Sequence, residues 1–503
     1  MLLTLSHSPS WPRRCHRRAT HLTGSPRRGG PSGRSRTLGR TRTTPDVRGR
    51  HLTLEWSPVR PPPLRLRKTL GWGDGLALVV GIMVGSGIFR TPGIVASSVG
   101  RPALTFVAWA LGGAVGLLGA LVFAELATRH PHAGGKYVYA RESFGRRAGF
   151  VIGWVEALTY CAAVAAIGVV CGDYLSRLLG WDPRAASITG VALIVAVTAV
   201  HLVGVRLGTM AQNLVTAAKV LALLGVLVVA AVAGSGAGWT GSLPGAPSGT
   251  ALFGAMAVAF QAVIWTYYGY PDAAKVAEEM KDPDRSLPRV FLGAIASVTA
   301  LYLLLNAAFV HVLPFDRIAR STLVAGDAAE AMFGPRAGAV MSGLALLVVL
   351  ASLNGNLFVT PRVVFGLSRD GLGPRVLSRV NPGGTPWTAL LLVALVAVLL
   401  AATGTFERLL SLAITFILVT DGFMVVVLFK LRAGRPAAPF RVPLYPLVPL
   451  LFLGTYVLLL VGALVEQPTI TLTGLAALGV VALVSWLVVE EGGAASAPGH
   501  PTA

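Results

Sequence analysis

The feature that most constrains this chain is a series of apolar stretches, each long enough to cross a lipid bilayer. A helix needs about 20 apolar residues to span about 30 Å of hydrocarbon, and twelve candidates follow Gly71. Their approximate limits are 72–96, 103–127, 148–179, 187–204, 209–233, 251–275, 289–313, 336–361, 387–403, 407–430, 447–465 and 470–489. The sequence therefore predicts an all-α membrane protein with twelve transmembrane helices.

The composition agrees with lipid as the main solvent. Charged residues make up 13% of the chain and hydrophobic residues 54%, whereas soluble domains contain about 25% charged residues. A soluble fold of this size would need more polar surface than these residues supply. The composition therefore excludes an ordinary soluble protein.

The distribution of Lys and Arg predicts the orientation of the spans, because cytoplasmic loops carry an excess of these residues. With the N-terminus inside, the loops that face the cytoplasm hold eighteen Lys and Arg, and the opposite loops hold seven. We therefore expect a multi-pass protein of the cell (plasma) membrane with both termini in the cytoplasm.

The first 68 residues differ from the rest of the chain. They hold sixteen Lys and Arg against two acids, which supplies +14 of the net charge of +21. Their composition predicts a disordered tail before a transmembrane domain over 69–490 and a short tail over 491–503.

To explain the basic tail we favour a mis-called start codon, because a GC-rich upstream frame translates as Arg, Gly and Pro. An arm for nucleic acid or anionic lipid is the alternative, but we expect no nucleic-acid partner. No apolar region with a cleavage site follows, so the tail is not a signal peptide.

Neither cysteines nor histidines form a recognisable metal or redox pattern. The three cysteines are Cys15, Cys161 and Cys171, and no pair has the spacing of a metal or redox motif. The nine histidines lack the H-E-x-x-H arrangement. No serine–histidine or aspartate-pair constellation lies within the spans. We therefore expect no cofactor, no metal and no enzyme activity.

The first span has small residues at mid-membrane, where Gly85, Ser86 and Gly87 follow Gly81. Each glycine costs up to about 1 kcal/mol relative to alanine inside a helix. Gly81 and Gly85 have the spacing of a close helix–helix contact. For the first span alone, this packing interpretation is as good as an interruption of the helix.

The sixth span favours interrupted helices over close packing as the explanation of these glycines. Gly269 and Pro271 interrupt it, where no lipid-facing break is tolerated. The first and sixth spans also open two sets of five helices, 1–5 and 6–10. Interrupted helices at matching positions of two halves indicate an inverted-repeat transporter with its binding site near the membrane midplane.

The two breaks offer complementary chemistry. Unwinding at Gly85–Ser86–Gly87 frees N–H groups at a half-helix N-terminus, which attract a carboxylate. Unwinding between Trp265 and Tyr268 frees carbonyl groups, which accept hydrogen bonds from an ammonium group. A ligand that carries both groups a short distance apart is an α-amino acid. Trp265, Tyr267 and Tyr268 can cover it as an aromatic gate, although such residues also serve as plain packing.

A series of different short motifs stands in a fixed order along the chain. They are Gly85-Ser86-Gly87-Ile88-Phe89, Phe123-Ala124-Glu125-Leu126, Glu278-Glu279-Met280-Lys281-Asp282-Pro283, Ser352-Leu353-Asn354-Gly355-Asn356, Pro386-Trp387 and Pro439-Phe440-Arg441-Val442-Pro443. With these motifs the chain resembles the amino acid–polyamine–organocation superfamily, and within it the L-type amino acid transporter-like permeases, over about residues 70–489. The resemblance implies the leucine-transporter fold, a 5+5 inverted repeat of ten core helices with two peripheral ones.

The resemblance also implies which residues bind the substrate. Gly85, Ser86, Gly87 and neighbouring Ile88 stand where the family binds the carboxylate. The segment that holds the amino group and supplies the gating aromatic corresponds to Trp265, Thr266, Tyr267, Tyr268 and Gly269. The chain departs from the family after Gly269, where it has Tyr270-Pro271-Asp272, so side-chain selectivity cannot be carried over.

Lys219 is a cation inside the apolar fifth span, and a charge at membrane depth indicates a function by default. It lies about 15 Å from the cytoplasmic end at helical rise, which argues against snorkelling. In sodium-independent relatives a lysine at this place replaces a sodium ion. The resemblance thus implies that Lys219 links carbonyls near Gly81 to Ser352, either as a fixed cation or as a proton site.

Two acidic residues invite interpretation. We expect Glu125 to pair with cytoplasmic Arg or Lys. Asp421 either joins a proton pathway, or is explained by hydration at the helix end or by a bond to a neighbouring helix.

Together these features predict a secondary transporter that carries amino acids by exchange or by proton-coupled uptake. A polyamine or organocation permease is the first alternative, although the pocket spans offer few carboxylates besides Glu156. A non-transporting membrane sensor is the second, although no dedicated signalling domain is recognisable. The expected partners are an amino acid and the lipid bilayer, with the oligomeric state left open.

Overall fold

The computed structural model describes residues 68–489 apart from 69, 86, 133, 204, 235, 237, 404–405 and 434–435. The predictions made for the two tails, residues 1–67 and 491–503, lie outside the described residues. From residue 70 onward the described chain is built from helices and their connections.

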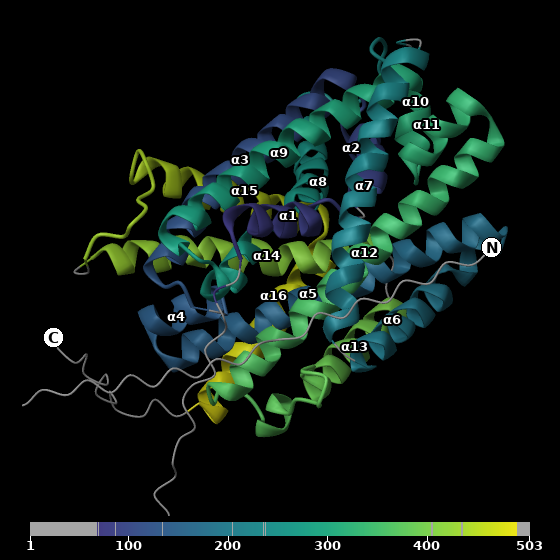
Figure 1. The fold of residues 1–503 in the computed structure, drawn as a ribbon. Coiled ribbons are helices and arrows are strands. Elements are labelled where there is room, and N and C mark those ends of the chain that lie inside the picture. The colour runs from purple at the N-terminus through teal and green to yellow at the C-terminus, as the bar shows by residue number, and fades with distance from the viewer. Residues whose placement is uncertain are drawn as a thin grey trace, which may run out of the picture. The chain divides into compact units, whose positions relative to one another are not determined.

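The structure places helices along nearly the whole described chain (Figure 1). In order they are α1 (Trp72–Met83), α2 (Gly87–Val99), α3 (Pro102–Arg129), α4 (Lys136–Phe144), α5 (Arg146–Leu179), η1 (Pro183–Ala185), α6 (Ala186–Val203), α7 (Val205–Ala233), α8 (Thr250–Tyr267), η2 (Tyr270–Glu279), α9 (Pro283–Val312), α10 (Phe315–Arg320), α11 (Val324–Phe333), α12 (Pro335–Arg369), η3 (Arg375–Ser378), α13 (Trp387–Thr403), α14 (Phe406–Arg432), α15 (Leu447–Glu466) and α16 (Pro468–Val488).

Within the described ranges, nine helical segments are long and apolar enough to cross a membrane. The pair α1 and α2, bent by 48° at its break, makes a tenth when it is counted as one span. Two shorter apolar helices, Ala217–Val232 within α7 and α13, lie in the two remaining ranges that the sequence predicts. The helical fold class is therefore confirmed, whereas the count of twelve membrane spans remains a prediction.

The long helix α5 lies at the centre of the bundle and packs against α4, α6, α12 and α14. In its most apolar stretch 83% of the residues are buried, compared with 17% for α16, which lies at the periphery. Small residues allow α5 and α6 to approach closely. A Cβ added to Gly172 would lie 1.9 Å from the Ala186 carbonyl oxygen, and one added to Gly190 would lie 2.5 Å from that of Gly168.

The outer surface of the bundle is apolar. Large aliphatic side chains are exposed on many helices, with Val203 84%, Val232 85% and Leu487 79% exposed. Apolar exposure of this extent on a monomer marks a surface that water does not cover. It is the surface expected of helices that face lipid hydrocarbon.

Two helical breaks lie side by side inside the bundle, because α1 packs against η2 and α2 packs against α8. The first break separates Met83 from Gly87, and the second separates Tyr267 from Tyr270. Gly269 in the second break has a φ of +128°, a conformation that residues with a Cβ rarely adopt. Both breaks fall where the glycines of the sequence predict them.

Candidate functional site

A cavity with about 50 Å³ of free volume lies where the two breaks meet. Its walls come from both breaks and from α5, α12 and α14. The lining residues are Ile82, Met83, Gly85, Gly87, Thr159, Tyr160, Ala163, Ile167, Trp265, Thr266, Tyr268, Gly269, Asp272, Ser352, Asn356 and Ile417.

Glycine is required at the first break because neighbouring helices press against it. A Cβ on Gly85 would lie 2.7 Å from the Ser352 Oγ of α12, and a Cβ on Gly87 would lie 2.6 Å from the Thr266 Oγ1 of α8. Ser86, predicted to bind substrate, lies outside the described residues. Ile88 is fully buried and does not line the cavity.

At the second break α8 ends and its last carbonyl groups face new partners. The Tyr268 N–H donates to the Trp265 carbonyl oxygen at 3.1 Å. The hydroxyl oxygen of Tyr302, on α9, lies 3.1 Å from the Thr266 carbonyl oxygen and 2.8 Å from the Met83 carbonyl oxygen, and its single O–H is shared between them. Tyr302 therefore ties the two breaks together. Each carbonyl oxygen has two lone pairs, so those of Trp265 and Thr266 can still accept a ligand ammonium.

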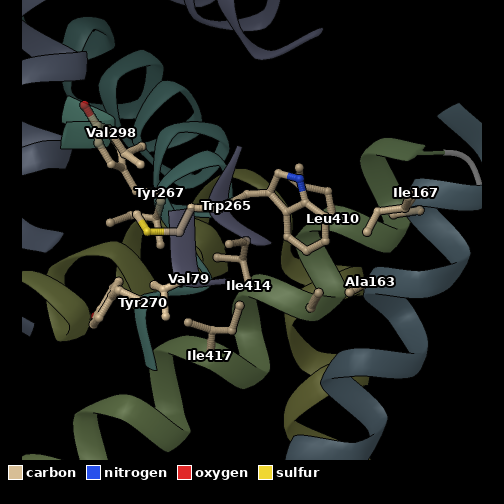
Figure 2. Packing of buried hydrophobic residues seen from close by; sticks show 14 of the residues in the cluster. Val79, Ala163, Ile167, Trp265, Tyr267, Tyr270, Val298, Leu410, Ile414 and Ile417 are labelled. Atoms are coloured by element: carbon tan, nitrogen blue, oxygen red, sulfur yellow. The ribbon is translucent and has the colours of Figure 1, made fainter. Parts of the chain in front are cut away.

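The two aromatic residues at the end of α8 have different surroundings. Figure 2 shows the Trp265 indole directed toward Leu410, with Ile167 beyond it, whereas Tyr267 lies on the opposite side with Val298. Trp265 lines the cavity. Tyr267 is outside the lining, donates its hydroxyl to the Trp109 carbonyl oxygen at 3.1 Å and packs against Tyr302. Tyr267 thus supports the core, and Trp265 is the aromatic wall.

Lys219 of α7 binds the end of α1. Its Nζ donates to the Val84 carbonyl oxygen at 2.8 Å and to the Gly81 carbonyl oxygen, and the residue is 1% exposed. The C-terminus of a helix carries partial negative charge, which stabilises a cation there. Among the described residues Lys219 forms no hydrogen bond to Ser352, which instead packs against Gly85.

Lys136 belongs to the loop predicted between the second and third spans, on the cytoplasmic side, yet it is buried against Tyr268 of the second break. Lys136 Nζ, at the start of α4, lies 2.7 Å from Asp421 Oδ1 of α14 and donates to the Tyr268 hydroxyl at 2.8 Å. Lys136 is 2% exposed and Asp421 is fully buried. Burial of the ammonium lowers its pKa, but the Asp421 and Glu156 carboxylates outweigh this and hold the pKa of Lys136 above its ordinary value of 10.5. The Lys136 ammonium therefore stays charged at neutral pH.

A second lysine, Lys275, stands at the end of the sixth predicted span, and its side chain is 9% exposed. Lys275 Nζ, on η2, lies 2.8 Å from Asp272 Oδ1 and 3.2 Å from Glu156 Oε1 of α5. The Tyr160 hydroxyl donates to Asp272 Oδ1. We call Glu156, Tyr160, Asp272 and Lys275 the Lys275 cluster. Two features of the sequence mark this cluster. Glu156 is an acid inside the third predicted span, and Asp272 and Lys275 stand three residues apart.

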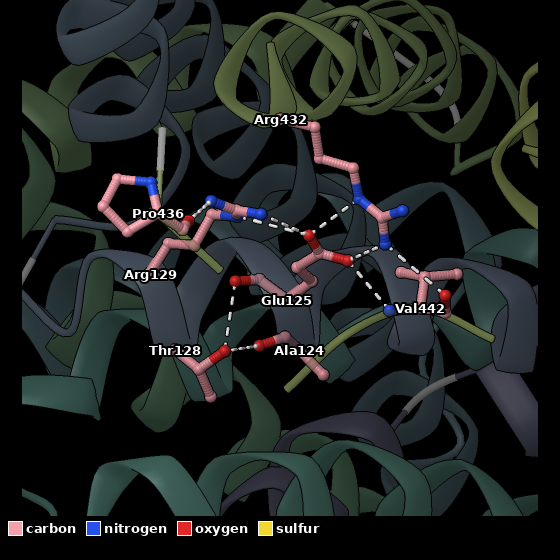
Figure 3. A network of polar contacts seen from close by, with 7 residues as sticks. All are labelled: Ala124, Glu125, Thr128, Arg129, Arg432, Pro436 and Val442. Atoms are coloured by element: carbon pink, nitrogen blue, oxygen red, sulfur yellow. Dashed lines mark hydrogen bonds and ion pairs between the residues drawn. The ribbon is translucent and has the colours of Figure 1, made fainter. Parts of the chain in front are cut away.

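Glu125, at the end of α3, forms the ion pairs that the sequence predicts (Figure 3). It accepts hydrogen bonds from Arg129 at 2.9 Å, from the Val442 N–H at 2.8 Å and from Arg432. This network joins α3 to α14 and to the segment before α15. Glu125 therefore has a structural role. For Asp421, the ion pair with Lys136 confirms a bond to a neighbouring element.

Comparisons with known proteins agree with this architecture. The family model of the amino acid permeases matches residues 70–494. The serine/threonine exchanger SteT of Bacillus subtilis is 30% identical over 77% of this chain and 89% of its own length. The b(0,+)-type amino acid transporter 1 of Homo sapiens is 27% identical over 81% of this chain and 85% of its own. The large neutral amino acids transporter small subunit 2 of Homo sapiens is 29% identical, over 82% and 78% respectively.

Broken helices around a midplane cavity define a class of membrane transporters. The chain belongs to the amino acid permease family. It is thus a multi-pass membrane transporter of amino acids and not an enzyme.

Proposed function

We propose that this protein moves small α-amino acids across the cell membrane by alternating access, without sodium. One observation carries the proposal. The start of α2, with its N–H groups, and the end of α8, with its carbonyl groups, line the same small cavity.

The substrate would lie between the two helix ends. Its carboxylate would accept hydrogen bonds from backbone N–H groups around Gly85, Ser86 and Gly87, where the helix terminus favours negative charge. Its ammonium group would donate to the carbonyl groups of Trp265 and Thr266. Trp265 would cover the bound substrate on the side of α5 and α14.

Lys219 supports the sodium-independent mode. Its ammonium already donates hydrogen bonds to the carbonyl oxygens of Gly81 and Val84 at the first break. A metal cation at the same carbonyl groups would have to displace it. We therefore propose Lys219 as the fixed cation of the carrier, with Gly81 as its partner and Ser352 as the residue that packs beside the break.

The cavity favours a short, polar and uncharged substrate side chain. Its free volume has room for only a few water-sized groups. Thr159 and Asn356 are polar residues of its wall. The relative from Bacillus subtilis is named a serine/threonine exchanger. We therefore propose serine and threonine as the first substrates and exchange as the first mode.

The proposal includes the number of membrane spans, their repeat and the side of the membrane on which the termini lie. Twelve spans would arise if α1 with α2, the short apolar part of α7, and α13 each cross the membrane beside the nine longer segments. The paired breaks support a 5+5 inverted repeat, with α15 and α16 peripheral. The excess of Lys and Arg on one side supports cytoplasmic termini.

Counterflow in proteoliposomes tests the function. Vesicles preloaded with unlabelled serine should accumulate labelled serine from outside, equally in sodium and in potassium buffer. Uptake without preloading, driven only by an inward proton gradient, would replace exchange by proton symport. No uptake of any amino acid from a full panel in either regime would refute amino acid transport.

A further inference from the structure

The Lys275 cluster has the composition of a complete binding site for an ammonium group. Lys275 Nζ lies between two carboxylates, at 2.8 Å from Asp272 Oδ1 and 3.2 Å from Glu156 Oε1. It also lies 3.6 Å from the centroid of the Tyr160 ring. A cation over an aromatic face within about 6 Å is attracted by the ring. Carboxylates and an aromatic face are the groups that recognise an alkylammonium ion.

This site adjoins the substrate cavity. Asp272 and Tyr160 both line the cavity, and the same two side chains contact the Lys275 ammonium. Glu156 is fully buried and is not among the residues that line the cavity. An ammonium group at the end of a substrate side chain would therefore meet Asp272 and Tyr160 first.

Charge balance leaves this site dependent on its lysine. The neighbouring cation, Lys136, is paired with Asp421 at 2.7 Å. Glu156 forms its ion pair with Lys275 at 3.2 Å, and the positive charge of Lys136 also acts on Glu156 and Asp272. Without Lys275, two buried carboxylates would have only the charge of Lys136, which Asp421 already pairs, and this is unfavourable.

We propose that Glu156, Tyr160 and Asp272 form an ammonium-binding subsite beside the substrate cavity, and that Lys275 occupies it with its own side chain. The tethered ammonium makes the carrier select neutral amino acids, because the carboxylates that would attract a cationic side chain are already neutralised. Lys275 is thus a specificity-determining residue that acts through Asp272. This inference rests on the proposed transport function for its physiological meaning, but the site itself can be tested separately.

The first experiment is inhibition of serine counterflow by L-lysine, L-ornithine and putrescine. The wild type should be insensitive. Lys275→Ala should be inhibited at concentrations at least about tenfold lower, a difference of about 1.4 kcal/mol. Lys281→Ala is the matched control, because Lys281 is exposed shortly after η2. A Lys275→Ala carrier that retains counterflow and stays as insensitive as the wild type would overturn the proposal.

A second measurement does not require transport. The melting temperature of purified Lys275→Ala should rise with methylammonium and not with tetramethylammonium, whose methyl groups leave no N–H donor. The wild type and Lys281→Ala should respond to neither ion. If Lys275→Ala is not recovered as a monodisperse protein, the double variant with Glu156→Gln enters the same assay, since it also removes one buried carboxylate. No selective rise would overturn the ammonium site.

The proposed transport function and the proposed ammonium site can be disproved separately. If wild-type protein shows no amino acid counterflow but methylammonium stabilises Lys275→Ala, the transport proposal is wrong and the ammonium site stands. If counterflow is present and neither inhibition nor stabilisation appears, Lys275 is only a structural ion-pair partner.

Discussion

The two helical breaks line one cavity but are held by different chemistry. At the first break, Lys219 donates to two backbone carbonyl oxygens, and no ion pair of Lys219 occurs among the described residues. At the second break, Lys136 and Lys275 contact side-chain carboxylates. The first break is therefore held by a helix end and one charge, and the second by compensated ion pairs.

The difference predicts different consequences of losing a lysine. Removing Lys219 leaves carbonyl groups, which are neutral. Removing Lys136 leaves a buried carboxylate without its cation, and such a charge is far more expensive to bury than a dipole. Stability should thus depend most on the second break, and transport without loss of folding should depend most on the first.

The largest effect on folding is expected for Lys136→Met. Asp421 is fully buried, and an unpaired charge there should destabilise the protein by about 3–5 kcal/mol. The measurement is the monodisperse yield and melting temperature in detergent. The Lys136→Met/Asp421→Leu double variant removes both charges and should recover much of the loss. A single variant as stable as the wild type would contradict the role of this pair.

Lys219→Ala should mainly affect transport. We expect serine counterflow to fall at least about tenfold, equivalent to about 1.4 kcal/mol in the barrier. The melting temperature should fall less than for Lys136→Met. Lys430→Ala, on the exposed end of α14, is the control. Unchanged kinetics in Lys219→Ala would remove the function proposed for Lys219.

Gly87→Ala tests the close contact between the breaks. The new Cβ would lie 2.6 Å from Thr266 Oγ1 and 2.9 Å from its Cα, and overpacking of this kind costs about 1–3 kcal/mol. Counterflow and melting temperature should both fall. Gly225→Ala is the matched control, because no atom of the residues that the structure describes comes within 4 Å of the added Cβ. Equal behaviour of the two variants would show that the contact at Gly87 is not tight.

The smallest effect is expected for Tyr302→Phe. The variant loses the hydroxyl that bridges the Met83 and Thr266 carbonyl oxygens, with a cost of about 0.5–1.5 kcal/mol. Because Met83 and Thr266 both line the cavity, the KM for serine should change more than the melting temperature. Tyr445→Phe, with an exposed ring, serves as control. A shift in melting temperature with an unaltered KM would make Tyr302 a packing residue only.

The sequence by itself determined the helical membrane class and the positions of both breaks. Apolar length specifies a spanning helix because lipid offers no hydrogen bonds to the backbone. Gly85, Gly87, Gly269 and Pro271 mark the interruptions because their backbone preferences are local. The apolar fifth span marked Lys219 as a functional cation, and the family resemblance added its role; the structure places Lys219 against the end of α1.

Only the tertiary structure decided how the remaining charges are used. Counted along the chain, Lys136 and Lys275 look like loop charges, yet both are buried against acids. Their partners Asp421 and Glu156 lie far away in sequence, and no local pattern encodes such a pairing. An ion pair between distant residues depends on the position of whole helices. Packing therefore settled which residues surround the cavity and which charges neutralise Asp421 and Glu156.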